Sequence, residues 1–207
     1  NTVKVEKGNF LLFFKNRDRL FRYILSILIG LPTWLCIGIL ITFSTEYAKE
    51  MHMIGSVDAG KSILYAYILI SLGDLFIGFV SHWLKSRKKA VLIYFIFTAI
   101  FITLYFSILW NQPAWMMYVV CAGIGLGTGF WAIFVTMAAE QFGTNLRATA
   151  ATTVPNMVRG MLPVLIIILH FFESIVMNTI QAAWVLSSLV MLISFIALFL
   201  IPDRKST

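Results

Sequence analysis

The sequence predicts an all-α membrane protein with six transmembrane helices, and three observations support this prediction. Of the 207 residues, 60% are hydrophobic and only 12% are charged, whereas about a quarter of the residues in a soluble domain are charged. The apolar residues gather in runs of about 20 or more, which lets a helix cross a ~30 Å hydrocarbon core. The charged residues cluster between these runs. Six such runs in succession favour membrane spans over the buried helices of a soluble domain.

The apolar runs define six spans and three segments of the chain. The second and third spans are separated by a basic connection, and the fourth and fifth by a connection that contains Arg147. An even number of spans places both ends on one side, so we expect an N-terminal segment at 1–19, a six-helix bundle at 20–201 and a tail at 202–207. In chain order the predicted spans are Leu20–Phe43, Ser62–Leu84, Ala90–Trp110, Ala114–Ala139, Ala148–Phe172 and Ile180–Ile201.

Lysine and arginine residues lie almost entirely on one side of this arrangement. The opposite side holds only Lys49 and Lys61. Because the loops rich in Lys and Arg stay in the cytoplasm, we expect both termini to be cytoplasmic and the protein to lie in a bacterial inner (plasma) membrane. The net charge of +7 thus follows from topology and does not indicate a nucleic-acid partner. The basic side contains Lys4, Lys7, Lys15, Arg17, Arg19, Arg22, Lys85, Arg87, Lys88, Lys89, Arg147, Arg204 and Lys205.

The two halves of the chain share an organisation. Each half has three spans, the first of each three is interrupted by Gly or Pro, and the second of each three carries a charged residue. Pro32 interrupts the first span, and a run of alternating glycines from Gly123 to Gly129 interrupts the fourth. Because each half has an odd number of spans, the pattern predicts 3+3 inverted repeats, a common plan for transporters.

Two charged residues lie deep in predicted spans and are the main functional candidates. Asp74 precedes Lys85 by 11 residues and Arg159 follows Arg147 by 12, so both lie roughly 16–18 Å from the cytoplasmic edge. A charge at this depth needs a partner or a watery cavity. Arg159 could bind substrate, or it could neutralise Asp74 or a carboxylate outside this chain. Asp74 is the candidate for proton coupling, and the alternative is a carboxyl that only packs between helices.

The residues around Arg159 supply the remaining candidates for substrate binding. Asn156 and Arg159 lie between Pro155 and Pro163, and helix breaks of this kind commonly mark binding sites in membranes. Polar and small residues form one stripe on the second span, at positions 67, 71, 74, 78 and 81, and another on the fifth, at positions 149, 152, 156, 159 and 163. We expect both stripes to face protein or water. Weaker candidates border the interrupted first and fourth spans, namely Thr33, Trp34, Thr128 and Trp131.

Two connections carry motifs that resemble those of a known family. The second span has Gly73-Asp74 and Gly78 before a basic connection, similar to the pattern Gly-x-x-x-Asp-(Arg/Lys)-x-Gly-(Arg/Lys)-(Arg/Lys), although His82 stands where the strict pattern has Asp. The segment from Glu140 to Arg147 resembles Glu-x-Phe-Pro-Thr-x-x-Arg, with Gly in place of Pro. Both patterns are typical of the major facilitator superfamily, and the whole chain resembles the C-terminal half of such a twelve-helix transporter.

This resemblance implies an architecture and a mechanism. It implies an N-terminal six-helix half as a partner, with residues 1–19 as the end of the central cytoplasmic loop. It also implies that Arg87, Glu140 and Arg147 form a cytoplasmic gate, that the second and fifth spans line the interface with the other half, and that the first and fourth border the central cavity. An ordinary exposed ion pair, worth about 0–1 kcal/mol, is the alternative for the gate.

The resulting prediction is a secondary active transporter that moves a small polar or anionic metabolite across the bilayer by alternating access, coupled to protons. A drug or metabolite exporter is one alternative, and a six-span scaffold or sensor that transports nothing is another. The sequence contains no nucleophile–base–orienter set, so we do not expect an enzyme. His170 and Glu173 alone do not make a metal site, and we expect no metal or cofactor.

Overall fold

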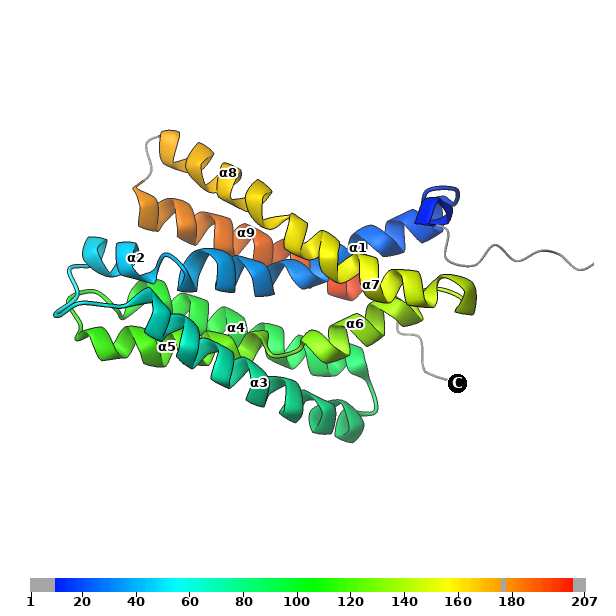
Figure 1. Ribbon diagram of the computed structural model, residues 1–207, viewed down its shortest axis with the longest axis horizontal. Helices are drawn as coiled ribbons and strands as arrows, with labels where there is room; N and C mark the ends of the chain where they lie inside the picture. The colour runs from blue at the N-terminus through cyan, green and yellow to red at the C-terminus, as the bar shows by residue number, and fades with distance from the viewer. Residues whose placement is uncertain (1–9, 176–177, 203–207) are drawn as a thin grey trace, which may run out of the picture.

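The computed structural model describes residues 10–175 and 178–202, and this part of the chain consists mainly of helices joined by short loops (Figure 1). The predictions for Lys4, Lys7, Arg204 and Lys205 lie outside the described residues. The described part contains no β-strand, only an isolated bridge between Ile54 and Pro113. In chain order the elements are η1 (Phe10–Phe13), α1 (Arg17–Leu35), η2 (Cys36–Ile41), α2 (Ser44–Glu50), α3 (Ala59–Leu84), α4 (Arg87–Ser107), α5 (Ala114–Thr128), α6 (Trp131–Glu140), α7 (Thr144–Gly160), α8 (Leu162–Ser174) and α9 (Thr179–Leu200).

Six helical stretches are long and apolar enough to cross a membrane, and each overlaps a predicted span. Several begin about three residues earlier than predicted, because side chains cap their first turns. Asn16 accepts a hydrogen bond from the Asp18 N–H, Asp58 from the Gly60 N–H and Ser86 from the Lys89 N–H. Basic residues that follow the caps therefore lie inside helices. Helix α1 consequently includes the last three residues of the predicted segment 1–19.

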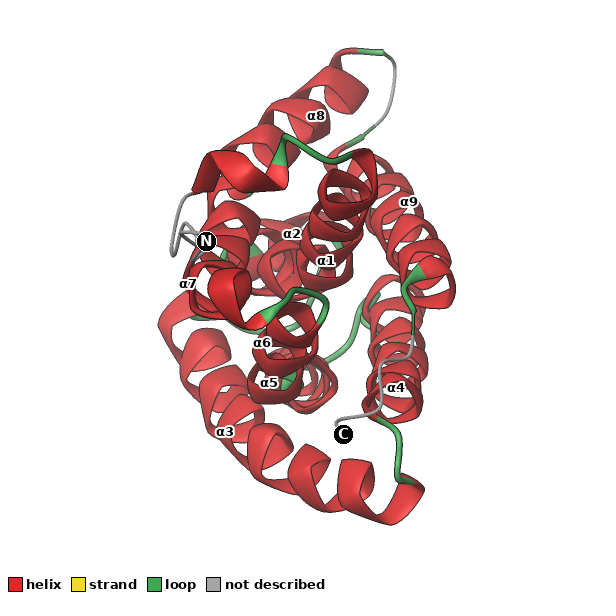
Figure 2. Ribbon diagram, turned by 90° about the vertical axis from the view of Figure 1, so that its right-hand side faces the viewer, coloured by secondary structure: helices red, strands yellow, loops and turns green. Residues whose placement is uncertain are grey.

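Helix α1 and the segment η2 that continues it lie at the centre of the bundle. In this span 72% of the most apolar stretch is buried, against 17% for α3 and 28% for the span made of α7 and α8. Figure 2 shows α1 end-on, with α8 and α9 on one side and α3 to α6 on the other. The largest helix–helix contact joins α3 and α5. Helices α3, α7 and α8 therefore form the open faces of the bundle.

Three of the six spans are interrupted. The first changes at η2 into a π-helix, a form common at functional sites. The fourth breaks at Gly129 and Phe130, between α5 and α6, and the fifth breaks at Met161, between α7 and α8. Pro163 has no N–H to bond the Arg159 carbonyl four residues earlier, which explains why the fifth span cannot continue as one regular helix.

Polar contacts join several elements at the basic end of the bundle. Arg87, the first residue of α4, pairs with Glu140, the last residue of α6. The Lys88 Nζ donates to the Phe199 and Ile201 carbonyls at 2.8 and 2.9 Å, so a cation satisfies the C-terminal end of α9. Gln141 donates to the Pro202 carbonyl at 3.1 Å. These contacts tie α4, α6 and α9 together at one end.

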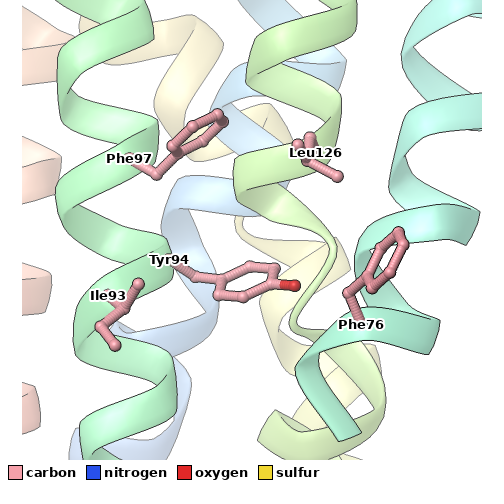
Figure 3. A pocket seen from close by; sticks show the side chains of 5 residues that line it. All are labelled: Phe76, Ile93, Tyr94, Phe97 and Leu126. Carbon is pink, nitrogen blue, oxygen red and sulfur yellow. The ribbon is translucent and has the colours of Figure 1, made fainter. Parts of the chain in front are cut away.

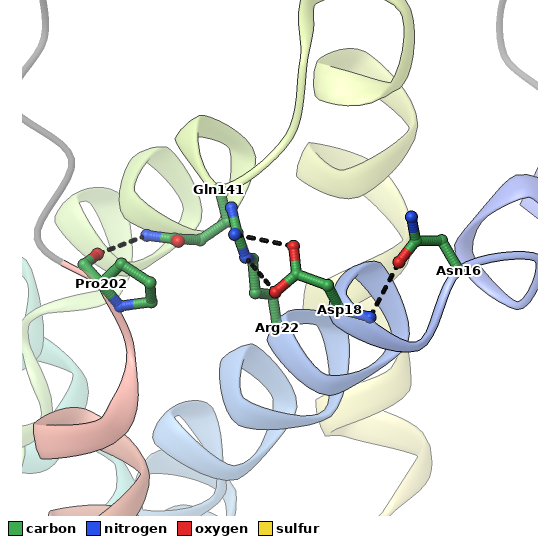
Figure 4. A network of polar contacts seen from close by, with 5 residues as sticks. All are labelled: Asn16, Asp18, Arg22, Gln141 and Pro202. Carbon is green, nitrogen blue, oxygen red and sulfur yellow. Dashed lines mark hydrogen bonds and ion pairs between the residues drawn. The ribbon is translucent and has the colours of Figure 1, made fainter.

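The first turn of α1 adds a further ion pair at this end (Figure 4). The Arg22 Nη2 lies 2.7 Å from the Asp18 Oδ2, one helical turn away. Asp18 is exposed, so the pair is solvated and contributes about 0.3–0.5 kcal/mol. Both residues belong to α1, so the pair does not link α1 to another helix.

Candidate functional site

Arg159 lies against two tryptophan rings on an exposed face of the bundle. Its guanidinium carbon lies 5.6 Å from the centroid of the Trp34 ring and 5.9 Å from that of the Trp131 ring. Both distances fall within the range of cation–π attraction, which contributes about 0.5–2 kcal/mol. The two rings meet edge to face, with centroids 6.4 Å apart. A weak hydrogen bond of 3.4 Å from the Arg159 Nη1 to the Asn156 Oδ1 completes the arrangement.

Each member of this cluster lies beside an interruption in its span. Trp34 follows Pro32 and precedes the π-helical segment, Trp131 is the first residue of α6, and Arg159 is the penultimate residue of α7. Phe134 packs against the Trp131 ring with a centroid distance of 5.0 Å. The sequence candidates Trp34, Trp131, Asn156 and Arg159 are thus brought together from α1, α6 and α7. We call these four residues the Arg159 cluster.

Thr128, the fifth predicted substrate contact, does not join the Arg159 cluster. Its side chain is fully buried, and its hydroxyl is within hydrogen-bond distance of the Ile124 and Gly125 carbonyls of its own helix, at 3.0 and 3.1 Å. The polar group is therefore already satisfied inside α5. A threonine in an apolar helix commonly bonds to the preceding turn in this way, and this local preference favours packing over substrate contact.

Asp74 and Arg159 do not pair with each other in the described chain. The Asp74 Oδ1 accepts a hydrogen bond of 3.1 Å from the Ala132 N–H, in the first turn of α6. The Arg159 guanidinium has its two ring contacts and Asn156, and no acidic partner among the described residues. Two charges at similar predicted depth thus approach α6 separately. The hypothesis that they neutralise each other receives no support from this arrangement.

Two polar groups near the Arg159 cluster have no hydrogen-bond partner in the described chain. They are the Trp34 Nε1 and the Thr33 Oγ1, and both atoms are buried. Thr33, like Trp34, was a weak candidate from the sequence because it follows Pro32 in the interrupted first span. An unpaired buried donor costs about 1–3 kcal/mol. A polar ligand that formed a hydrogen bond with either group would remove this cost.

The predicted polar stripes lie on the exposed faces of their helices. On α3 the side chains of Tyr67 and Ser71 are exposed and Asp74 is half-buried, while on α7 Thr152 and Arg159 are exposed. Their neighbours on the opposite sides of the two helices pack into the bundle. The polar members of both stripes named here are therefore at least partly exposed in the described structure.

Two of the three residues predicted to form a cytoplasmic gate contact each other. Arg87 and Glu140 form an ion pair, and both side chains are half-buried. Arg147, in the first turn of α7, is exposed and takes no part in the ion pairs of the described residues. The contact between α4 and α6 is thus a property of the structure, whereas its action as a gate stays a prediction.

An apolar groove lies between α3, α4 and α5, away from the Arg159 cluster (Figure 3). It has a volume of about 180 Å³ and is lined by Phe76, Ile93, Tyr94, Phe97 and Leu126. Its one polar side chain, Tyr94, donates to the Gly73 carbonyl at 2.9 Å. The groove therefore offers no free polar group for a charged ligand.

Metal binding is not indicated in the residues that the structure describes. No group of three His, Cys, Asp or Glu side chains there could hold a metal ion. His170 and Glu173 contact each other at 2.7 Å near the end of α8, as a pair within one helix.

Comparison of the chain with protein-family models, curated proteins and solved structures finds no match. The candidate site is therefore defined by its own geometry: a cation against two indoles that contact each other, where three interrupted spans meet.

Proposed function

We propose that this protein is a secondary active transporter of the major facilitator type. It moves a small polar or anionic metabolite across a membrane by alternating access, coupled to protons. The basic end of the bundle faces the cytoplasm. The single observation that carries the proposal is the Arg159 cluster, because an exposed guanidinium without an acidic partner would be costly against lipid. Water or substrate in a central cavity removes that cost.

The interruptions in three spans support a binding site at this position. Transporters commonly place substrate at the midplane, where helices are broken and backbone groups are free. Pro163 frees the Arg159 carbonyl, and the break between α5 and α6 leaves amide groups beside Trp131 without partners in their own helix, of which Asp74 accepts a hydrogen bond from Ala132. Six uninterrupted spans would leave no such free backbone groups in the membrane. The breaks converge on one cluster although they lie in three different parts of the sequence.

The chemistry of the cluster favours a small ligand with a carboxylate or another planar anionic group. A guanidinium presents its donors in a planar fork that matches a carboxylate in two-point contact. The faces of Trp34 and Trp131 limit the space beside Arg159 and favour an apolar or flat ligand body. Asp74 is the proposed site of the coupled proton. Its carboxylate contacts the start of α6 and not the Arg159 guanidinium.

The proposal includes a second six-helix unit that packs against the open faces of α3, α7 and α8. Together the two units form the twelve-helix architecture, with 3+3 inverted repeats in each. The exposed polar stripes support this, since neither suits lipid. An intact natural polypeptide with a mass near twice 23.4 kDa would supply that unit within one chain, and denaturing mass spectrometry measures this directly.

Uptake by the natural-length protein in proteoliposomes tests the proposal. A panel of radiolabelled small carboxylates is presented with and without an imposed pH gradient. We expect Arg159→Ala to weaken uptake of the transported compound by about 10- to 150-fold, the loss of a charge-assisted contact worth about 1.5–3 kcal/mol. Arg159→Lys retains the charge but loses the planar fork of donors, so its uptake should lie between that of the wild type and that of Arg159→Ala. Lys61→Ala, at the other end of the bundle, serves as the control.

The outcomes separate the proposal from its alternatives. Uptake that needs the pH gradient and requires Arg159 supports a proton-coupled importer. Substrate movement out of vesicles against its gradient would indicate an exporter. If Arg159→Ala transports at the wild-type rate while remaining folded, the Arg159 cluster is not the substrate site. If the wild-type protein moves no compound in either direction, the scaffold or sensor alternative takes precedence.

A further inference from the structure

Asp74 caps a helix to which it does not belong. Its carboxylate on α3 accepts a 3.1 Å hydrogen bond from the Ala132 N–H, and the Trp131 N–H also interacts with it. These are the first two amides of α6, which have no partner within their own helix. The Phe130 at the N-cap position of α6 provides no side-chain acceptor. Asp74 supplies the acceptor that the local sequence lacks.

Close contact between two glycines makes this reach possible. A Cβ on Gly73 would lie 3.0 Å from the Gly129 Cα, and a Cβ on Gly129 would lie 2.7 Å from the Gly73 Cα. The two backbones therefore touch, which places the short Asp74 side chain directly at the start of α6. From α4, the Tyr94 hydroxyl holds the Gly73 carbonyl at 2.9 Å. The position of Asp74 is thus determined by three helices.

The capped residue is also the one that contacts Arg159. Trp131 is the first residue of α6, and its ring lies 5.9 Å from the Arg159 guanidinium and 6.4 Å from the Trp34 ring. We propose that Asp74 is a positioning residue for the Arg159 cluster: by capping α6 it determines where the Trp131 ring, and through it Arg159, lies. The two embedded charges are then linked through α6, without an ion pair between them.

If Asp74 acts by capping α6, its substitution by Asn and its substitution by Ala should have different effects. Asn is as good a helix cap as Asp, whereas Ala has no acceptor. Asp74→Asn should therefore keep the Arg159 cluster in place although it cannot exchange a proton. Asp74→Ala should release the first turn of α6 and displace Trp131. The significance of this position for transport rests on the proposed function, but the contacts themselves do not.

Fluorine NMR of the natural-length protein labelled with 5-fluorotryptophan measures the positions of the rings without any substrate. Trp131→Phe and Trp34→Phe identify the two resonances of interest, and Trp184 serves as an internal reference on α9. We expect Asp74→Ala to shift or broaden the Trp131 and Trp34 resonances. Asp74→Asn should leave both in place. Asp58→Ala, which removes the comparable cap of α3, is the matched control and should leave both unchanged.

A variant that lengthens the side chain keeps the test decisive if Asp74→Ala does not fold. Asp74→Glu retains the negative charge but cannot keep the same short contact, so it should also move the Trp131 resonance. Unchanged resonances in Asp74→Ala, or in Asp74→Glu when the alanine variant does not fold, overturn the proposal. Equal shifts in the Asn and Ala variants also overturn it, because charge rather than capping would then be responsible.

Transport assays on the same variants add an independent reading. Asp74→Asn should retain substrate exchange at equal pH on both sides but lose accumulation driven by a pH gradient, whereas Asp74→Ala should lose both. A wild-type protein that transports nothing would refute the proposed function and leave the NMR result standing. Loss of exchange in Asp74→Asn with native tryptophan resonances would show that capping alone does not maintain the site.

Discussion

The Leu28 carbonyl shows how one residue of this bundle depends on another far along the chain. Pro32 has no N–H, so the carbonyl four residues earlier loses its partner within α1. The Ser194 hydroxyl of α9 lies 2.7 Å from that carbonyl and 2.8 Å from the Val190 carbonyl of its own helix, so its single proton is shared between them. A serine 166 positions later thus satisfies the backbone group that the proline leaves free.

Removing this hydroxyl should destabilise the bundle. We expect Ser194→Ala to lower the free energy of unfolding by about 0.6–1.7 kcal/mol, the range measured for hydrogen bonds between membrane helices. Ser187→Ala, about two helical turns earlier on the same face of α9, is the matched control. Its buried hydroxyl donates only to the Ala183 carbonyl of the same helix, so its removal should cost less. Equilibrium unfolding in mixed detergent micelles measures both.

A double-mutant cycle distinguishes the hydrogen bond from Ser194 to the Leu28 carbonyl from general packing of the Ser194 side chain. Pro32→Ala restores an N–H that can bond the Leu28 carbonyl within α1, so Ser194→Ala should cost less in that background than in the wild type. An equal cost in both backgrounds would show that Ser194 contributes through packing alone.

The contact between α3 and α5 depends on glycines that leave no room for a side chain. A Cβ on Gly125 would meet the backbone of Ala66, and a Cβ on Gly127 would lie 2.5 Å from the Thr98 Oγ1. The alternating glycines of α5 therefore face α3 and α4 in turn. This agrees with close helix packing, and it explains why the fourth span contains so many small residues.

Two glycines of α3 provide a comparison within one helix. A Cβ on Gly73 would lie 2.6 Å from the Leu126 carbonyl oxygen, whereas Gly78 has no atom within 4 Å of the same position. Because backbone cannot move aside easily, we expect Gly73→Ala to destabilise the bundle by about 1–3 kcal/mol. Gly78→Ala should be neutral or slightly stabilising, since Ala favours helix over Gly. Thermal unfolding in detergent compares the two, and equal destabilisation would contradict the close crossing.

The whole molecule has an apolar exterior on some helices and a polar exterior on others. The exposed side chains of α4 and α9 are mainly apolar, among them Ile96, Ile100 and Phe199. On α7 the exposed positions include Thr152 and Asn156. Lipid suits the first surface and not the second. The asymmetry is what a membrane protein with one lipid-facing and one cavity-facing side requires.

Cysteine labelling in native membranes tests this asymmetry. Thr152→Cys and Ile96→Cys lie at similar depths, each about 13 Å from the basic start of its helix. We expect a charged, water-soluble methanethiosulfonate to label the cysteine at 152 at least several-fold faster, because a cavity-facing position is wetted whenever the cavity opens. The native Cys36 and Cys121 are buried and contribute little background. Equal rates at both positions would contradict a wetted α7 face.

The helical class, the six spans and the basic end of the bundle could all be predicted from the sequence. Span length and polarity are properties of consecutive residues, so an apolar run can be recognised without knowing which segments pack against it. The boundaries were less well predicted. Asn16, Asp58 and Ser86 cap their helices, so each helix begins among charged residues and earlier than its apolar run. The candidates around Arg159 were found because charge and proline are conspicuous inside a span.

The partners of those candidates were decided by the tertiary structure alone. The sequence places Asp74 and Arg159 at a similar depth, which permits an ion pair, yet Asp74 bonds to the start of α6 and Arg159 lies against Trp34 and Trp131. Sequence determines which residues enter the apolar region and how far along each helix they lie. Which side chains then meet depends on how the helices cross, and crossings such as that of Gly73 with Gly129 join residues that are distant in the chain.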